Sequence, residues 1–523
     1  MPTIPEALSI AQQAAKDGDC AQAQFIYEQI LKAAPDEPHA LHALFALARQ
    51  AGQLEQAEVY LRRAIAAFPA EGIFTHNLYQ LLSVQKRWNE AADCCRRAIE
   101  AGGATPELCN NLGTVLKAAG QLEPAVSSFR DAIRLRSDYG DAHYNLANTQ
   151  LMLHRVAEAE EAFAEAARLN PADCDVHNNR GGLLRLQGKL VEAAECFEAA
   201  LAVRPDSAEA HRNRATLRLL MGDYEQGWPE YEWRWKLNDG PRPSFSEPRW
   251  QGQPLDGGTI LLWAEQGLGD TIQFIRYAPL VKQLGARVLV ECPAVLHALL
   301  QSAEGIDRFV VAGGARFDYQ IPLLSLPAVL GTTLATVPAN IPYLHAAPDR
   351  IAHWKNELAG VDAFKVGVAW HGSPQYPGDY FRSFPLAKLA PVAACPRVQL
   401  FSLQKYTGCE QLATWAGPGD IVDMGSSLDL GGDAFLDTAA VMMNLDLVIT
   451  CDTAIGHLAG ALGVPVWLAL QPAPNWRWVM GRDDSPWYPT VRLFRQSRLG
   501  DWEGVFAEIA ARLRSLSTGS SLK

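Results

Sequence analysis

A 34-residue period runs through the first half of the chain and limits how that half can fold. The run GDCAQAQFIYEQILKAAP begins at Gly18, and GQLEQAEVYLRRAIAAFP follows it 34 residues later at Gly52. Further copies begin at Gly120, His154 and Gly188. Alanines keep the same spacing at Ala23, Ala57, Ala91, Ala125, Ala159 and Ala193, and prolines close copies at Pro35, Pro69, Pro171 and Pro205. Small residues let two helices cross closely and proline ends a helix, so each copy is predicted to be a helix pair.

This pattern resembles the tetratricopeptide repeat over residues 1–238. The resemblance implies an α-superhelix with a concave groove, which in that family usually holds a peptide. A partner polypeptide is therefore the expected guest of this region.

One column of the repeat consists of asparagines, each in the first helix of its copy: Asn77, Asn111, Asn145, Asn179 and Asn213. An amide both donates and accepts, so it can bracket a peptide bond without contacting the side chain. Neighbouring asparagines would lie on the order of 10 Å apart, about three residues of an extended chain. We favour a ladder that binds an acceptor polypeptide, and the column resembles that of the protein O-GlcNAc transferases. The alternative is that the amides bond between neighbouring repeats and hold the scaffold.

Strands alternate with helices in the rest of the chain, which predicts parallel sheets. Residues 239–257, rich in proline and glycine, are predicted to be a linker. A first lobe at 258–345 has the strand TILLWA, the turn EQGLGD, the helix TIQFIRYAPLVKQLG and the strands RVLVEC, RFVVAG and YQIPLLS. A second lobe at 346–498 has the strands FKVGVAW, VQLFSLQ, DIVDMG, LDLVIT and VPVWLAL, and 499–523 is a helix and tail. Two Rossmann-like lobes would bind a ligand at the carboxyl ends of their strands.

Two turns carry the candidate chemistry. The first, EQGLGDTIQF, contains Gly267, Gly269 and Asp270, and it has two glycines where the dinucleotide fingerprint has three. Asp270 is either a functional carboxylate or the cap of the following helix.

The second turn, CDTAIGHLAGALGVPV, gathers four polar or special residues at one helix start: Asp452, Thr453, Gly456 and His457. A helix start attracts anions, so a phosphate is the favoured guest. The alternative is that Asp452 and Thr453 only cap the helix and His457 packs in the core.

The pair GLGDTIQFIRYAPL and DTAIGHLAGALGVPV resembles the heptosyltransferase-type glycosyltransferases, which have the GT-B fold, over about residues 258–500. The resemblance implies that Asp270 is the general base and that the second turn binds a nucleotide-sugar. Ala454 stands where that family usually has glycine. A phosphate-facing lysine of the family has its counterpart in Arg382, followed by Ser383. The resemblance also implies inversion, and repeats joined to such lobes are similar to bacterial protein glycosyltransferases, including those that modify flagellin.

Sugar transfer builds negative charge on the departing diphosphate and requires an activated acceptor hydroxyl. The helix after Thr453, with His457 and either Arg382 or Lys405, is expected to stabilise that charge, and Asp270 to accept the hydroxyl proton. The only co-substrate expected is a nucleotide-sugar, with no cofactor. No D-x-D sequence occurs in 240–523, so a metal-bridged diphosphate is not expected. Trp476, Arg477 and Trp478 either line the site or pack in the core, and we do not count them as site residues.

Composition narrows the remaining classes. A net charge of −12 over 523 residues argues against a general nucleic-acid or membrane-surface binder, although it does not exclude a local basic pocket. Ten scattered cysteines without a C-x-x-C pair, no apparent signal peptide and no membrane-length apolar run predict a cytoplasmic protein. Oligomeric state is not fixed by the sequence; repeat arrays can dimerise through their convex faces.

Three functions compete at this point. The leading one is a glycosyltransferase that modifies a protein recruited by the repeats. The second is an adaptor whose α/β half no longer does chemistry. The third is an enzyme with a glycolipid acceptor, which the acidic balance and lack of membrane features disfavour.

Overall fold

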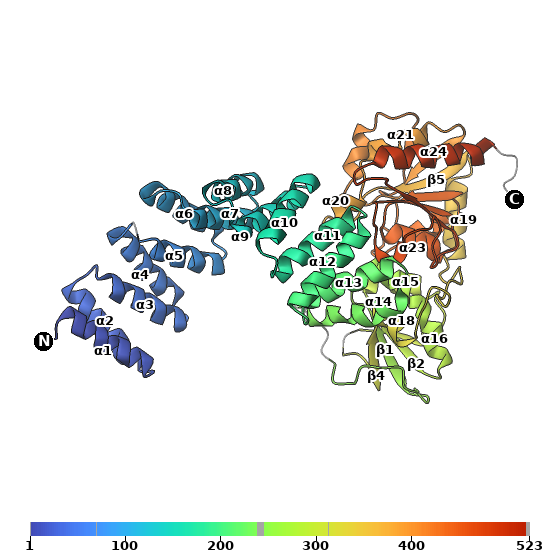
Figure 1. The fold of residues 1–523 in the computed structure, drawn as a ribbon. Helices are drawn as coiled ribbons and strands as arrows, with labels where there is room; N and C mark the ends of the chain where they lie inside the picture. The colour runs from blue at the N-terminus through green and yellow to red at the C-terminus, as the bar shows by residue number, and fades with distance from the viewer. Residues whose placement is uncertain (1, 70, 238–244, 312, 519–523) are drawn as a thin grey trace. The chain divides into compact units, whose positions relative to one another are not determined.

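The computed structural model describes residues 2–69, 71–237, 245–311 and 313–518. Within the predicted linker, residues 239–244 lie outside this described part, as does the predicted tail at 519–523. The chain divides by packing into two compact units, Met1–Arg180 and Gly181–Lys523. Figure 1 labels the helices and strands of both units.

The first unit consists of antiparallel helix pairs, as the 34-residue period predicts. Its helices are α1 (Ile4–Lys16), α2 (Cys20–Ala33), α3 (Pro38–Gln50), α4 (Leu54–Ala67), α5 (Gly72–Val84), α6 (Trp88–Gly102), α7 (Pro106–Ala118), α8 (Leu122–Leu135), α9 (Gly140–Met152), α10 (Val156–Leu169) and the start of α11 (Cys174–Leu186). The periodic alanines, including Ala57 and Ala125, are fully buried. Gly113 of α7 faces the ring of Phe129 on α8, where a Cβ would come within 2.6 Å of the ring. The predicted small-residue helix crossing is confirmed.

After the end of α11, the second unit continues with three further repeat helices and a 3-10 turn. They are α12 (Leu190–Val203), α13 (Ala208–Leu220), α14 (Tyr224–Tyr231) and η1 (Glu232–Lys236). Leu219, Leu220 and Trp228 lie in one buried core with Ile260 and Ile272 of the α/β region. The Trp228 indole also donates to the backbone oxygen of Thr332, 3.0 Å away. The packing division therefore falls inside the repeat region, because these helices share a core with the sheets that follow.

The first sheet has four parallel strands in the order β3-β2-β1-β4. Its strands are β1 (Thr259–Trp263), β2 (Arg287–Glu291), β3 (Arg308–Val310) and β4 (Tyr319–Pro322), each within a predicted strand. The segment predicted to be a helix after β1 is helical, but it is not one regular helix: α15 (Leu268–Phe274), η2 (Ile275–Tyr277) and α16 (Ala278–Gln283) follow one another. Pro279, in the first turn of α16, lacks the N–H that a continuous helix needs.

The second sheet has six parallel strands in the order β10-β9-β8-β5-β6-β7. Its strands are β5 (Phe364–Ala369), β6 (Val398–Ser402), β7 (Ile421–Asp423), β8 (Leu447–Thr450), β9 (Val466–Leu470) and β10 (Val491–Arg495). The first five confirm predicted strands, whereas β10 was not predicted. The strand order reverses between β5 and β8, as in doubly wound sheets that bind ligands at such a switch point.

Helices cover both faces of the six-stranded sheet. The remaining helical segments are η3 (Ala294–Leu296), α17 (His297–Leu300), η4 (Leu323–Ser325), α18 (Leu326–Val329), α19 (Pro348–Glu357), α20 (Asp379–Arg382), η5 (Leu386–Leu389), α21 (Ala390–Ala393), η6 (Cys409–Thr414), α22 (Leu436–Met442), α23 (Ala454–Ala461), η7 (Trp476–Trp478) and α24 (Trp502–Thr518). Ile449 of β8 packs in one core with Phe506 of α24, whereas Val448 packs in the core that contains Leu458 of α23. Helices α15 and α23 contact each other between the two sheets (Figure 1).

Among the described residues, no helix combines the length and the apolar character needed to cross a bilayer.

Candidate functional site

A cavity of about 1100 Å³ opens at the carboxyl ends of β5 and β8, in the second unit. Ala369 ends β5, and Asp452 and Thr453 follow β8; all three line the cavity. The cavity thus lies at the switch point of the six-stranded sheet, where open α/β sheets bind their ligands. Its volume is slightly above the usual range for pockets that hold drug-sized molecules, about 300–1000 Å³.

The start of α23 forms one wall of this cavity. Thr453 is the N-cap residue, and its side chain makes no capping hydrogen bond. The Thr453 hydroxyl lies 3.4 Å from the Thr450 hydroxyl instead. A helix start with no side-chain cap is suited to bind an anion.

Asp452 and Arg382 lie together at this helix start. The Arg382 guanidinium donates to the Asp452 backbone oxygen at 3.0 Å and to Asp379 Oδ1 at 2.9 Å. Burial raises the pKa of the Asp452 carboxyl, and the charge of Arg382 offsets this only in part. Burial by itself lowers the pKa of Arg382, but the Asp452 and Asp379 carboxylates raise it overall. Arg382 therefore stays charged, whereas Asp452 has the environment of a carboxyl that can carry a proton.

His457 lines the cavity one turn into α23. Its Nδ1 lies 3.0 Å from the Tyr488 hydroxyl, and its ring stacks on Trp478 with centroids 5.2 Å apart. Within the described chain Nε2 has no hydrogen-bond partner, so this nitrogen is available to a ligand. Burial, with the nearby charge of Arg477 among others, lowers the pKa of His457 well below its ordinary value. A neutral imidazole can donate to or accept from a ligand but adds no charge.

Two predicted donor-binding residues lie outside the cavity lining. The Ser383 hydroxyl donates to Asp379 Oδ2 and accepts from the Gly372 N–H, each at 3.0 Å. Gly456 faces the sheet, where a Cβ would lie 2.8 Å from Leu468 Cδ2. The close approach that Gly456 permits is thus between helix and sheet, and Ser383 supports helix α20, which carries Arg382.

Lys405 lines the cavity after β6. Its Nζ donates to the Leu428 backbone oxygen at 2.6 Å and lies 5.8 Å from the ring centroid of Tyr406. The carbonyl places the ammonium group without neutralising its charge.

The glycine turn after β1 faces α23. Asp270 Oδ2 accepts from the Gly267 N–H at 2.9 Å, so Asp270 does cap the start of α15, as one of its two predicted roles requires. Asp270 Oδ1 pairs with the Arg477 guanidinium. A carboxylate has about four acceptor positions, so these two contacts leave room for an acceptor hydroxyl. A Cβ on Gly269 would lie 2.9 Å from His457 Cδ2 and 3.2 Å from Ala454 Cα. Gly269 thus allows α15 and α23 to touch.

Arg477 is a cavity residue that the sequence analysis left uncounted. Its guanidinium pairs with Asp270 and also donates to Asn475 Oδ1 at 2.7 Å and Gln273 Oε1 at 2.5 Å. Trp476 and Trp478 are almost fully buried in the core, which is the second of the two alternatives for them. The letters NWRW alone give no sign that the arginine between two core tryptophans reaches a carboxylate 207 positions away.

The asparagine column makes contacts between neighbouring repeats. The side-chain nitrogens of Asn77, Asn111, Asn145 and Asn179 contact His42, His76, Asn110 and Tyr144 respectively, at 3.0, 3.5, 3.0 and 2.9 Å. Each partner lies 35 positions earlier, so the partners form a second column with the same period. Asn213 lies on α13 in the second unit. The amide nitrogens of the first four thus make the scaffold contacts of the alternative interpretation, and acceptor binding by the column stays a prediction.

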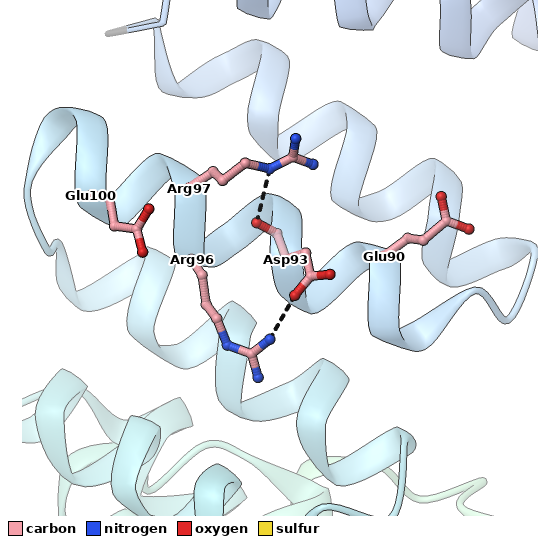
Figure 2. Close-up of a pocket in the computed structure, with 5 residues that line it drawn as sticks. All are labelled: Glu90, Asp93, Arg96, Arg97 and Glu100. Atoms are coloured by element: carbon pink, nitrogen blue, oxygen red, sulfur yellow. Dashed lines mark hydrogen bonds and ion pairs between the residues drawn. The ribbon is translucent and has the colours of Figure 1, made fainter.

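Figure 2 shows a second hollow, on one face of α6, lined by Glu90, Asp93, Arg96, Arg97 and Glu100. Arg96 pairs with Asp93 at 2.7 Å, and both side chains are more than two-fifths exposed. Exposed pairs of this kind contribute little and point to no ligand.

Comparison with known proteins identifies the repeats. The tetratricopeptide repeat model matches residues 110–174 and 175–227, so the N-terminal region contains tetratricopeptide repeats. Protein FlbA of Caulobacter vibrioides is 30% identical over 325 residues, which cover 57% of this chain and 54% of FlbA. The chain thus spans about half the length of this curated relative.

Solved repeat proteins show lower similarity. YrrB, described as a TPR protein with an unusual peptide-binding site, is 20% identical over 35% of this chain and 95% of its own, with a TM-score of 0.30. A tetratricopeptide repeat protein from Parabacteroides merdae is 16% identical over 45% of this chain and 93% of its own, with a TM-score of 0.37.

Proposed function

We propose that this chain is a glycosyltransferase that moves a sugar from a nucleotide-sugar to a hydroxyl of a protein recruited by the repeats. In this proposal the two sheets are the lobes of a GT-B fold. One observation carries the proposal: an uncapped helix start, a charged arginine and an available imidazole nitrogen line one large cavity at a sheet switch point.

The donor diphosphate would lie at the start of α23. The N–H groups at the start of α23 and the Arg382 guanidinium would stabilise the charge that grows as the bond between sugar and phosphate breaks. His457 Nε2 would hydrogen-bond a phosphate or sugar oxygen. None of these groups needs to reorganise during the reaction, because Arg382 is already held by Asp379 and His457 by Tyr488 and Trp478.

The acceptor hydroxyl would attack the anomeric carbon and lose its proton to a carboxylate. Asp270 is the base that the family resemblance implies. Replacing Asp270 with asparagine tests this role: loss of the base lowers kcat far more than it weakens nucleotide-sugar binding.

The repeats support a protein acceptor because the matched repeat region also lines the cavity. Gly182 and Arg185 of α11 and Thr216 of α13 belong to its lining. A polypeptide held by neighbouring repeats would therefore need only a short reach to the reacting centre. Flagellin is one acceptor to test, on the family resemblance alone.

Calorimetric titration of the full chain with a panel of sugar nucleotides tests the proposal. At least one is expected to bind, and Arg382→Gln is expected to weaken it about 10- to 100-fold, the effect of losing a charge-assisted contact. Arg350→Gln is a matched control, because Arg350 pairs with Asp437 in the same unit but does not line the cavity. Absence of binding and of hydrolysis across the panel would refute the enzyme proposal.

Acceptor class is tested by removing residues 1–173, which lie ahead of α11. Helices α13 and α14 must be kept, because they share the core of the α/β region. The shortened chain is expected to bind the nucleotide-sugar as the full chain does and to lose transfer to the protein. Retained transfer to the natural acceptor would instead favour a glycolipid.

The adaptor alternative has one observation in its favour: both Asp270 oxygens are already engaged, by the Gly267 N–H and by Arg477. An adaptor would bind its partner protein normally yet neither hydrolyse nor transfer any sugar.

A further inference from the structure

Four cationic side chains line the cavity, and three of them have partners. Arg382 contacts Asp379 and the Asp452 backbone oxygen, Lys405 contacts the Leu428 backbone oxygen, and Arg477 contacts Asp270. The fourth is Arg185, which in the described part of the chain has neither a carboxylate nor a hydrogen-bond acceptor. A cationic side chain of this kind at a ligand cavity is uncommon, because partly buried charges are normally paired.

Arg185 comes from the repeat region, not from either sheet. It lies in the last turn of α11 and is partly buried. Burial lowers the pKa of its guanidinium and the charge of Arg212 adds to this, while Tyr376 acts in the opposite direction. Removal from water therefore costs energy at this position, and no carboxylate compensates for it.

Tyr376 relates Arg185 to the proposed phosphate site. The Arg382 guanidinium lies 4.5 Å from the centroid of the Tyr376 ring, and Tyr376 is near enough to Arg185 to influence its titration. All three residues line the same cavity. Arg185 thus lines the same cavity as Arg382, with Tyr376 near both, and can meet a different group of the same ligand or of a second one.

We propose that Arg185 binds an oxyanion, a phosphate or carboxylate group, of a ligand held in the cavity. The planar guanidinium can hold two oxygens of such a group at once. The repeat region would then contribute to the ligand site itself as well as to partner recruitment. This inference deepens the proposed function, on which the identity of the ligand rests, but the oxyanion contact can be tested without it.

Chemical protection tests the contact in the full wild-type chain. Phenylglyoxal modifies accessible guanidinium groups, and peptide mass spectrometry measures the rate at each arginine. Arg185 is expected to react and to be protected at least tenfold by inorganic pyrophosphate. Arg168, which is two-thirds exposed and pairs with Glu165, is the internal control and should keep its rate. An unreactive Arg185, or one that pyrophosphate does not protect, overturns the proposal.

Substitution identifies the source of the oxyanion. Arg185→Gln is expected to weaken its ligand about 10- to 100-fold, and Arg185→Lys, which keeps the charge but loses the planar fork, should restore part of this. If the group is a donor phosphate, Arg185→Gln weakens binding even of a nucleoside diphosphate that carries no sugar. If it is a sugar carboxylate, the variant weakens a uronic-acid sugar nucleotide but not its neutral counterpart. If it is a carboxylate of the acceptor, only the acceptor KM rises.

The outcomes separate this inference from the proposed function. A chain that binds no sugar nucleotide yet shows pyrophosphate protection at Arg185 keeps the oxyanion site and loses the glycosyltransferase proposal. Arg185→Gln with wild-type affinity for every probe, and with the same acceptor KM as Arg168→Gln, overturns the oxyanion site and leaves the glycosyltransferase proposal intact.

Discussion

Replacing Gly269 with alanine tests whether the contact between α15 and α23 shapes the cavity. The added Cβ would lie 2.9 Å from His457 Cδ2, 3.2 Å from Ala454 Cα and 3.6 Å from Ala454 Cβ. Two of these separations are closer than ordinary van der Waals contact. One of those two atoms belongs to the backbone, and a backbone atom yields less easily than a side-chain end.

The imidazole cannot relieve the clash by turning away. Its Nδ1 is held by the Tyr488 hydroxyl at 3.0 Å, and its face stacks on Trp478. We therefore expect Gly269→Ala to lower the free energy of unfolding of the second unit by about 1–3 kcal/mol, the usual range for overpacking. The two helices would have to move apart by a few tenths of an ångström, and nucleotide-sugar affinity should fall with that displacement.

Thermal unfolding and hydrogen exchange of the amides of α15 and α23 measure the effect. Gly182→Ala is a matched control, because Gly182 lines the same cavity, lies in a helix and has open space at its Cβ position. It should leave stability unchanged or raise it by about 0.5–1 kcal/mol. If Gly269→Ala unfolds and exchanges like Gly182→Ala, the two helices do not touch as described and the cavity wall is wrong.

Three further predictions follow from individual contacts. The folded state holds the Asp452 proton more tightly than the unfolded chain does, so the free energy of unfolding falls as pH rises and Asp452 ionises. Asp452→Asn should therefore raise the melting temperature at pH 7 and make no difference below about pH 4. Buried His457 resists protonation, so below about pH 6.5 this residue should cost the wild type up to about 1.4 kcal/mol of unfolding free energy per pH unit. Denaturant titrations between pH 7 and 5 should show that His457→Gln lacks this slope. Asn145→Ala removes the bond to Asn110 and the contact from Lys117, so thermal unfolding should report a loss of about 1–3 kcal/mol; unchanged unfolding would favour a column that serves only a bound peptide.

Features that repeat or alternate locally were predictable. The helix pairs follow from alanines and prolines at a fixed period, and nine strands follow from short apolar runs between glycine and proline turns. The start of α23 was predictable too, because a strand, a polar turn and a helix are adjacent in the chain. Strand β10 was not predicted because VRLFR mixes apolar and charged residues. Its extended conformation depends on pairing with β9.

Contacts between distant segments were not predictable from one sequence. Asp270 and Arg477 are 207 positions apart, and only the packing of α15 against α23 and η7 brings them together. The role of Arg185 could not be predicted, since nothing in LLRLQ indicates which face of α11 the cavity occupies. The column of asparagines could be found in the sequence by its period. Its column of partners could not, because histidine, asparagine and tyrosine occupy the equivalent positions and the change of residue type hides their shared period.

The charge of the cavity explains how an acidic chain can still accept an anion. The chain carries a net charge of −12, yet the residues that line the cavity include four aspartates and four cations. Asp429 is already committed to the start of α22, where it accepts from the Asp437 N–H at 2.6 Å and from the Thr438 hydroxyl at 2.5 Å. Distant surface charge is screened within about 8–10 Å at physiological salt, so the local balance of charge decides whether an anion can bind.

A phosphate entering beside Asp452 would favour protonation of that carboxyl, whose pKa burial already raises. The cavity would then carry a net positive charge at the moment of binding, which predicts that nucleotide-sugar binding takes up a proton and tightens as pH falls towards the pKa of Asp452. Titrations in buffers of different ionisation enthalpy measure that uptake, and its persistence in Asp452→Asn would contradict this account.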